Sequence, residues 1–266
     1  MGEYFIIGDS HSHHKAIKAL LKQEGLLKGG KRLRPDVTVI HLGDLLNSVI
    51  SSRDDDLKSL ELVENGTINF LVLGNHETPY FNLPAFAGFF NFPEIKERLD
   101  ALYKLGVIKP AMAIEDEILL THAGLGKTIG DGIASPQEAV QDVDGAFLYD
   151  KHDSIISAIP WARGGSVKHG GIFWADWSEA KSTKFTQIVG HTSKLRTIRT
   201  YSNRSPQGEN RMSLSASDLG HTSFKTDCKI VFNIDVGCNL TGALPCSAIA
   251  GAWVTENRIK FALRRG

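Results

Sequence analysis

Residues 4–11 read Tyr-Phe-Ile-Ile-Gly-Asp-Ser-His, and this stretch sets the pattern from which the fold can be predicted. Four apolar or aromatic residues favour a buried strand, which stops at a glycine followed by an aspartate and then a histidine. The same arrangement returns at residues 37–44, which end in Gly43-Asp44, and at residues 68–77, which end in Gly74-Asn75-His76-Glu77. Apolar residues at helical spacing separate these strands. The order strand, helix, strand, helix, strand predicts a parallel sheet with right-handed connections.

Side chains that can hold a metal ion follow five of the predicted strands. Parallel strands bring their carboxyl ends to one edge of the sheet, where ligands of such sheets bind. Two later strands, 113–120 and 185–189, lead into His122 and His191. The collected strand-end residues are two carboxylates, three imidazoles and one amide: Asp9, His11, Asp44, Asn75, His122 and His191. A turn or a helix cap explains any one of them, but not five strand ends at once.

This set of side chains indicates a site for two divalent cations. Manganese, iron and zinc accept mixed oxygen and imidazole ligands, and the absence of thiolates argues against a structural zinc site. Asp44, on the middle strand of three, is the natural candidate to bridge both ions. Two ions held ~3.5–4 Å apart can share a water, lower its pKa and clamp a phosphoryl group. The residues therefore predict hydrolysis of a phosphoester.

The rest of the sequence predicts further elements of one α/β domain that covers residues 1–266. Helices are expected at 16–24, 57–63 and 93–105 and through much of 136–159, and a hairpin is expected at 248–263. The stretch at about 200–226 is rich in serine, asparagine, glycine and arginine and has few large apolar residues. We expect it to be a polar surface excursion.

Composition excludes several classes of protein. The 266 residues carry 30 Lys plus Arg and 30 Asp plus Glu, so no basic excess favours a stable nucleic-acid complex or a membrane as partner. No apolar run approaches the 18 or more residues that a membrane helix needs, and residues 1–7 lack the features of a secretion signal, so we expect a cytoplasmic protein. Three cysteines without a Cys-x-x-Cys spacing predict no disulfide framework.

The strand-end motifs, taken in order, resemble those of the calcineurin-like metallophosphoesterases. The match rests on Gly8-Asp9-x-His11, Gly43-Asp44, Gly74-Asn75-His76-Glu77, Thr121-His122-Ala123-Gly124 and Gly190-His191-Thr192. It is closest to the branch of the phosphoprotein phosphatases and the bacterial symmetrical dinucleoside tetraphosphatases. The segment Ile234-Asp235-Val236-Gly237-Cys238 also resembles the closing strands of that branch. The resemblance implies a four-layer α/β/β/α sandwich.

The resemblance also implies a role for each site residue. Asp9 and His11 would hold the first ion, Asp44 would bridge, and Asn75, His122 and His191 would hold the second. A metal-bridging hydroxide would attack the phosphorus, and His76 would be the general acid that protonates the leaving oxygen. Mn²⁺ is the first choice of metal, with Fe, Zn or Ni as alternatives. The substrate would be a phosphorylated small molecule, nucleotide or protein.

Two positions depart from the family motif Gly-Asp-x-x-Asp-Arg-Gly, because this chain has Asn47 and Ser48 there. An amide at position 47 can orient His76 but cannot stabilise its charged form as a carboxylate would, which favours substrates with acidic leaving groups. Serine cannot grip phosphate as arginine does, so another cation should replace it. Arg163, in a glycine-rich stretch, is the first candidate and Arg53 the second.

Alternatives remain open at this stage. Gly-His-Thr occurs twice, and His221 competes with His191, although the buried strand before His191 favours the latter. Substrates such as dinucleoside polyphosphates and cyclic nucleotides would need the same ions. Asp9-x-His11-x-His13 also resembles the first strand of a polymerase-and-histidinol-phosphatase or amidohydrolase barrel, but the strand-rich last third lacks the required strand–helix units. A non-catalytic scaffold with the same fold should have lost ligands, and this chain keeps all six.

Overall fold

The computed structural model describes most of the chain. The described residues are 2–47, 52–86, 89–126, 128–176, 179, 184–192, 198–202, 210–214, 223–225, 229–236, 248–256 and 258–265. Ser48 and His221 lie outside them, as do the three cysteines.

The first sheet contains the strands that precede Asp9, His11, Asp44 and Asn75 of the predicted site. Its order is β12-β15-β14-β1-β4-β5-β6. The strands are β1 (Glu3–Ile7), β4 (Val37–His41), β5 (Phe70–Val72), β6 (Ile108–Lys109), β12 (Ser223–Phe224), β14 (Ala248–Thr255) and β15 (Arg258–Arg265). Strands β1, β4 and β5 are parallel, as the sequence predicts; β6, which the sequence did not predict, pairs parallel to β5, and the antiparallel hairpin β14–β15 extends the sheet beside β1.

The second sheet has the order β11-β10-β13-β9-β8-β7. Its strands are β7 (Met112–Ile114), β8 (Ile118–Leu120), β9 (Thr186–Val189), β10 (Ile198–Ser202), β11 (Asn210–Leu214) and β13 (Ile230–Asn233), and a separate hairpin pairs β2 (Leu27–Lys28) with β3 (Lys31–Arg32). Strands β8, β9 and β13 are parallel, so the ends of β8 and β9, which precede His122 and His191, point the same way.

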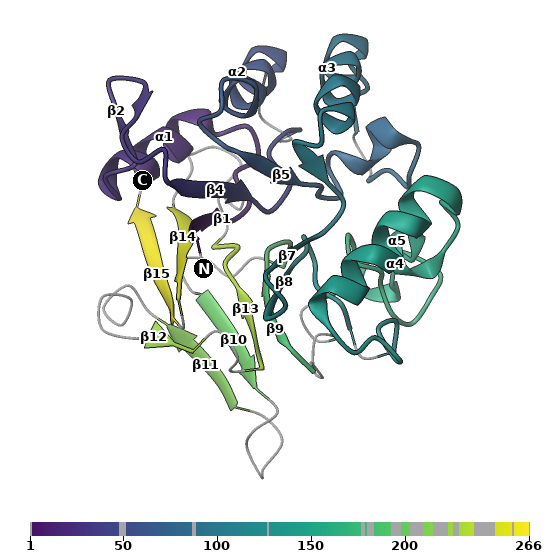
Figure 1. Ribbon diagram of the computed structural model, residues 1–266. Helices are drawn as coiled ribbons and strands as arrows, with labels where there is room; N and C mark the ends of the chain where they lie inside the picture. Colours follow the sequence, from purple (N-terminus) through teal and green to yellow (C-terminus); the bar gives the residue numbers. More distant parts are fainter. Residues whose placement is uncertain are drawn as a thin grey trace.

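Helices cover the outer face of each sheet (Figure 1). They are α1 (His14–Gln23), α2 (Arg53–Glu64), α3 (Pro93–Lys104), α4 (Pro136–Tyr149) and α5 (Ser154–Ser157), with short 3-10 helices η1 (Thr78–Phe81) and η2 (Trp161–Arg163). Between the sheets lies a second apolar cluster, in which Ile6 and Ile40 of the first sheet pack with Ile188 and Phe232 of the second. The molecule is therefore the four-layer α/β/β/α sandwich that the motifs imply.

Local sequence explains where the helices begin. Helix α2 starts with a capping box, in which the Ser52 hydroxyl accepts from the Asp55 amide and the Asp55 side chain accepts from the Ser52 amide. Three aspartates in its first turn complement the helix dipole. Helices α3 and α4 each begin at a proline, which suits the first helical position.

The region expected as a polar excursion contains strands. β10 and β11 pair as an antiparallel hairpin at the edge of the second sheet, and β12 pairs with β15. The sequences of β10 and β11, IRTYS and NRMSL, mix polar and apolar residues and lack the apolar run that marks the central strands. None of the helices in the described part of the chain is both long enough and apolar enough to cross a membrane.

Candidate metal centre

The loops that follow the strands adopt unusual backbone conformations. Non-glycine residues with positive φ include His11 at 44°, Asp44 at 51°, Asn47 at 56° and His191 at 66°. This left-handed region costs free energy for residues with a Cβ, and such residues cluster at functional sites. The glycines beside them allow close approach: a Cβ on Gly43 would overlap the backbone of Gly74. The loops can therefore meet at one point.

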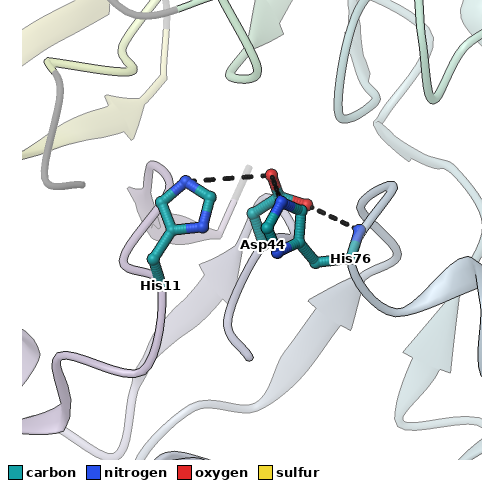
Figure 2. A group of neighbouring side chains, drawn as sticks. All are labelled: His11, Asp44 and His76. Carbon is teal, nitrogen blue, oxygen red and sulfur yellow. Dashed lines mark hydrogen bonds and ion pairs between the residues drawn. The ribbon is translucent and has the colours of Figure 1, made fainter. Parts of the chain in front are cut away.

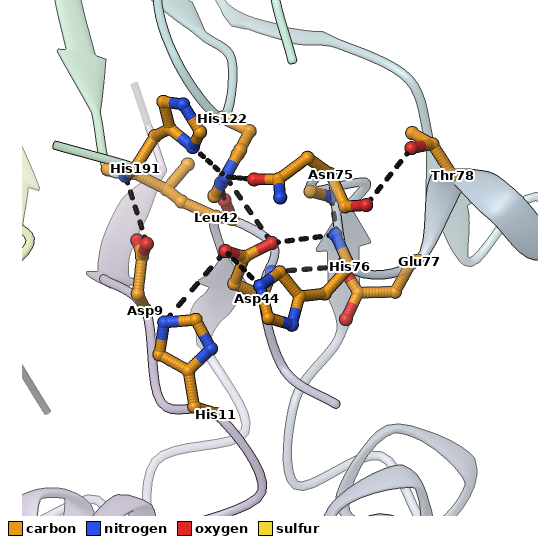
Figure 3. A network of polar contacts seen from close by, with 12 residues as sticks. Asp9, His11, Leu42, Asp44, Asn75, His76, Glu77, Thr78, His122 and His191 are labelled. Atoms are coloured by element: carbon orange, nitrogen blue, oxygen red, sulfur yellow. Dashed lines mark hydrogen bonds and ion pairs between the residues drawn. The ribbon is translucent and has the colours of Figure 1, made fainter. Parts of the chain in front are cut away.

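Four ligand atoms converge around His122, which is fully buried at the end of β8 (Figure 3). Its Nε2 lies 2.9 Å from Asn75 Oδ1, 3.2 Å from His191 Nδ1 and 3.4 Å from Asp44 Oδ1. Its Nδ1 lies 2.8 Å from the Leu42 carbonyl, which can only accept, so Nδ1 carries a proton. When the ring is neutral, Nε2 has a lone pair that faces two oxygens and a nitrogen. A cation bound there would interact with all four atoms.

A second group of ligand atoms, from His11 and His76, lies near the other carboxylate oxygen of Asp44 (Figure 2). His11 Nε2 is 3.9 Å and His76 Nε2 is 3.7 Å from Asp44 Oδ2. Asp9 Oδ2 accepts a hydrogen bond of 2.9 Å from the His191 amide, while Asp9 Oδ1 is buried without a hydrogen-bond partner among the described residues. A buried carboxylate oxygen without a donor suits a cation. All six predicted ligands thus lie around one pocket, and the carboxylate of Asp44 faces both groups.

The electrostatics of the pocket also fit bound cations. Burial raises the pKa of Asp9 well above its ordinary value, and the nearby Asp235 and Asp44 raise it further. Burial lowers the pKa of His11 to about 3 and holds the pKa of His191 well below its ordinary value, so both rings are neutral and can ligate. Burial alone would lower the pKa of His122, but Asp44 and Asp9 raise it to about 10. Positive charge is therefore favoured at this point.

Removing the cations should make the stability of the protein depend on pH. Since the folded pKa of His122 lies above its ordinary value of 6.5, its contribution is complete below pH 6.5 and is lost as pH rises through about 10. We expect the Tm of the chelated protein to fall over this window and that of the metal-loaded protein to change little. Burial raises the pKa of Glu77 from 4.5 to about 7, so the effect of its titration on stability falls mainly below this window. An equal slope in the His122→Gln variant would contradict the assignment.

His76 contacts position 47 through the main chain. Its Nδ1 lies 2.8 Å from the Asn47 carbonyl oxygen, and a face of its ring stacks on Phe86 with the ring centroids 4.0 Å apart. The side-chain Nδ2 of Asn47 instead donates to the His76 carbonyl at 3.2 Å and to the Tyr80 hydroxyl at 3.4 Å. The contact therefore differs from the side-chain contact that the sequence suggests, because the left-handed backbone of Asn47 turns its carbonyl toward the ring.

Glu77 joins two of the loops, a function that sequence reasoning did not assign. Its buried carboxylate accepts hydrogen bonds from the amides of Asp44 and Leu46, each at 2.9 Å, and of Gly74 at 3.0 Å. Because Asp44 and Gly74 follow different strands, Glu77 fixes the loop of the bridging carboxylate against the loop of Asn75 and His76. Its place at the end of the Gly-Asn-His-Glu motif was the available signal.

Asp235 was also missed as a site residue. It follows β13 and is buried next to Asp9, whose pKa it raises. An aspartate directly after an apolar strand repeats the pattern of Asp9 and Asp44, so the same rule could have found it.

The two arginine candidates occupy different surroundings. Arg163 donates a 2.7 Å hydrogen bond to Thr192 Oγ1 and lies 3.4 Å from the Asp176 carboxylate, so it stands beside the loop of His191. Arg53, at the start of α2, forms an ion pair with Glu94 at the start of α3. Arg163 is thus the arginine next to the pocket, and its charge adds to the effects that lower the pKa of His191.

Solved structures of similar fold include several phosphoesterases. A metallophosphoesterase from Sphaerobacter thermophilus is 15% identical, with a TM-score of 0.52 over 99% of this chain and 88% of that chain. A cold-active protein-tyrosine phosphatase of a Shewanella species is 12% identical, with a TM-score of 0.55 over 100% and 80%. A protein serine/threonine phosphatase from Saccharomyces cerevisiae is 12% identical, with a TM-score of 0.51 over 100% and 80%. At these identities the likeness shows the fold alone.

The sequence itself matches a family model. None of the curated proteins compared with this chain matches it. The model of the calcineurin-like phosphoesterases matches residues 4–214, a range that contains every predicted ligand from Asp9 to His191. The chain therefore belongs to the calcineurin-like phosphoesterase family and is a metal-dependent phosphoesterase.

Proposed function

We propose that this protein hydrolyses phosphomonoesters of proteins or nucleotides at a centre of two divalent cations. The observation that carries the proposal is the position of Asp44. One of its oxygens faces His122, and the other faces His11 and His76. A carboxylate so placed can bridge two ions, which is the arrangement that phosphoryl transfer with two metals requires.

The donor set supports the assignment of ligands that the family resemblance implies. Asp9 and His11 would hold one, Asn75, His122 and His191 the other, and Asp44 both; Mn²⁺ is the first choice for oxygen and imidazole ligands, with Fe, Zn or Ni as alternatives. When bound, such ions activate water and neutralise charge on the phosphoryl oxygens. Hydrogen bonds link the ligand loops to one another. Asp9 accepts from the His191 amide, and Asp44 Oδ1 accepts from the His76 amide at 3.0 Å.

His76 would supply the proton for the leaving oxygen. Its Nδ1 is engaged by the Asn47 carbonyl, so Nε2 is the nitrogen that faces the pocket beside Asp44. A proton held at Nε2 can pass to the oxygen that departs with the alcohol or phenol. The ring lies between Phe86 and His11, which leaves it little freedom to turn.

Arg163 would bind the substrate phosphate. We expect Arg163→Ala to lower kcat/KM by about 10- to 100-fold, mainly through KM, because a charge-assisted hydrogen bond contributes about 1.5–3 kcal/mol. The matched control is Arg53→Ala, which removes an arginine that pairs with Glu94 and should leave KM unchanged. Steady-state kinetics with an aryl phosphate decide the matter. An unaltered KM and kcat in Arg163→Ala would remove Arg163 from the site.

A substrate screen tests the function directly. Purified protein reconstituted with Mn²⁺ would be assayed on an aryl phosphate, a phosphopeptide, a nucleoside monophosphate, diadenosine tetraphosphate and a 2′,3′-cyclic nucleotide. We expect hydrolysis of the monoesters to dominate. Faster turnover of the dinucleotide or the cyclic nucleotide would make the protein a dinucleoside polyphosphate hydrolase or a cyclic-nucleotide phosphodiesterase. Metal binding without hydrolysis of any of the five would make it a non-catalytic scaffold.

A further inference from the structure

We propose that Asp56 is a positioning residue for the general acid His76, and that it acts through the main chain of Asn47. The inference rests on the proposed function, since it assigns a helper to the acid of that reaction. Asp56 belongs to the first turn of α2 and is only 2% exposed. It lies nine residues after Asn47 in the sequence and outside every motif of the family match.

The first step is the contact between Asp56 and Asn47. Asp56 Oδ1 accepts a 2.9 Å hydrogen bond from the Asn47 amide. The same oxygen accepts a hydrogen bond from the Ser12 hydroxyl. Hydrogen bonds to a carboxylate are stronger than those between neutral groups. Asp56 therefore joins the loop that follows β1 to the loop that follows β4, and fixes the main-chain amide of Asn47.

The second step is the conformation of Asn47. Its φ of 56° is left-handed, and this conformation turns its carbonyl to within 2.8 Å of His76 Nδ1. Conformations of this kind persist only where surrounding contacts hold them. The Asp56 carboxylate fixes the amide of Asn47, and the side-chain amide of Asn47 is fixed by the His76 carbonyl and the Tyr80 hydroxyl. The carbonyl that orients the imidazole is thus anchored on both sides.

The consequence concerns the missing carboxylate at position 47. The family motif that this chain resembles has aspartate there, and this chain has asparagine. Asp56 supplies a buried carboxylate in the same network, but it reaches His76 indirectly, through the backbone of Asn47. It orients the ring rather than pairing with it. Loss of Asp56 should therefore displace His76 and weaken proton donation, while the ligand atoms around Asp44 stay in place.

Neighbouring aspartates provide a matched control. Asp54, Asp55 and Asp56 all lie in the first turn of α2, and the sequence alone treats them as equivalent partners of the helix dipole. The structure separates them: Asp54 is exposed, Asp55 is half-buried and completes the capping box with Ser52, and Asp56 is buried and accepts from the Asn47 amide. A variant of Asp55 therefore weakens the helix start without touching His76.

The experiment compares leaving groups in the Mn²⁺-loaded, full-length protein. Asp56→Ala should lower kcat for an alkyl phosphate by about 100-fold, since a misplaced acid loses most of its effect, and kcat for p-nitrophenyl phosphate by less than about 5-fold, because that leaving group needs no proton. KM should change little. Asp56→Asn, whose oxygen can accept the same two hydrogen bonds, should restore most of the alkyl rate. Asp55→Ala should leave the ratio of the two rates unchanged.

Two further variants complete the test. If Asp56→Ala does not fold, Asp56→Glu keeps the charge but moves the carboxylate by one methylene, and the same selective loss is expected. In a His76→Gln background, Asp56→Ala should leave the ratio of rates unchanged, because no ring remains to be positioned. Equal losses on both substrates, or no loss, would overturn the inference. If Asp44→Asn loses activity but Asp56→Ala leaves the ratio of rates unchanged, only the inference about Asp56 is overturned. If Asp44→Asn is as active as the wild type, the proposed function is overturned.

Discussion

Replacing Asp44 by asparagine should lower kcat/KM for an aryl phosphate at least about 1,000-fold. The carboxylate faces both groups of ligand atoms, so one substitution would remove a ligand from each ion of the proposed centre. Two ions contribute several kcal/mol of charge stabilisation in the transition state, and each ~1.4 kcal/mol corresponds to a factor of ten. The asparagine side chain keeps an oxygen that can still accept from the His76 amide, so the fold of the loop should survive.

The control for this variant is a carboxylate far from the pocket. Asp142 lies exposed on α4, and Asp142→Asn should retain wild-type kinetics and metal content. Metal analysis after gel filtration should find less metal in Asp44→Asn than in the wild type, and circular dichroism should be unchanged. A fully metal-loaded Asp44→Asn variant with wild-type activity would mean that Asp44 bridges nothing.

His76→Gln should produce the second large effect, and the effect should depend on the leaving group. A positioned general acid contributes about 10²- to 10⁴-fold, so we expect alkyl phosphates to lose activity within this range. Aryl phosphates with an acidic phenol should lose less than about 10-fold, because the phenolate leaves without a proton. Glutamine retains an amide that can donate to the Asn47 carbonyl, so the loop should keep its course.

The measurement is a plot of log kcat against leaving-group pKa for a series of phosphate monoesters. The slope should be steeper in His76→Gln than in the wild type and than in His152→Gln, which replaces an exposed histidine before α5. Parallel lines displaced by a constant would show that His76 acts on all substrates alike, as a metal ligand does. That outcome would move His76 into the group with His11 and Asp44, whose ligand atoms all lie within 4.8 Å of one another.

Much of the fold could be predicted because its central strands have strong local signals. Residues 4–7 are continuously apolar or aromatic and residues 37–42 are largely apolar, because strands of a parallel sheet are buried on both faces. The structure confirms these strands and the final hairpin. Strands β10 and β11 were not predicted, because their short sequences mix polar and apolar residues and lack a continuous apolar run.

The pocket could be predicted for a different reason. Each predicted ligand follows a strand directly, so knowledge of the strand order alone brings Asp9, Asp44 and Asn75 to one edge. The contacts that position these residues could not be predicted in the same way. Asp56 and Glu77 reach the loops through backbone amides, and a backbone amide leaves no trace in the sequence of its partner. The orientation of the Asn47 carbonyl depends on a left-handed backbone that asparagine tolerates but does not require.

The most direct measurement is anomalous diffraction from crystals of the Mn²⁺-loaded protein, combined with metal analysis of the same sample. We expect two manganese ions per chain, ~3.5–4 Å apart, one on each side of the Asp44 carboxylate. The ligands should be Asp9 and His11 for one ion and Asn75, His122 and His191 for the other. Anomalous density absent from this pocket, a single ion that Asp44 does not touch, or ions bound elsewhere on the chain would contradict the account.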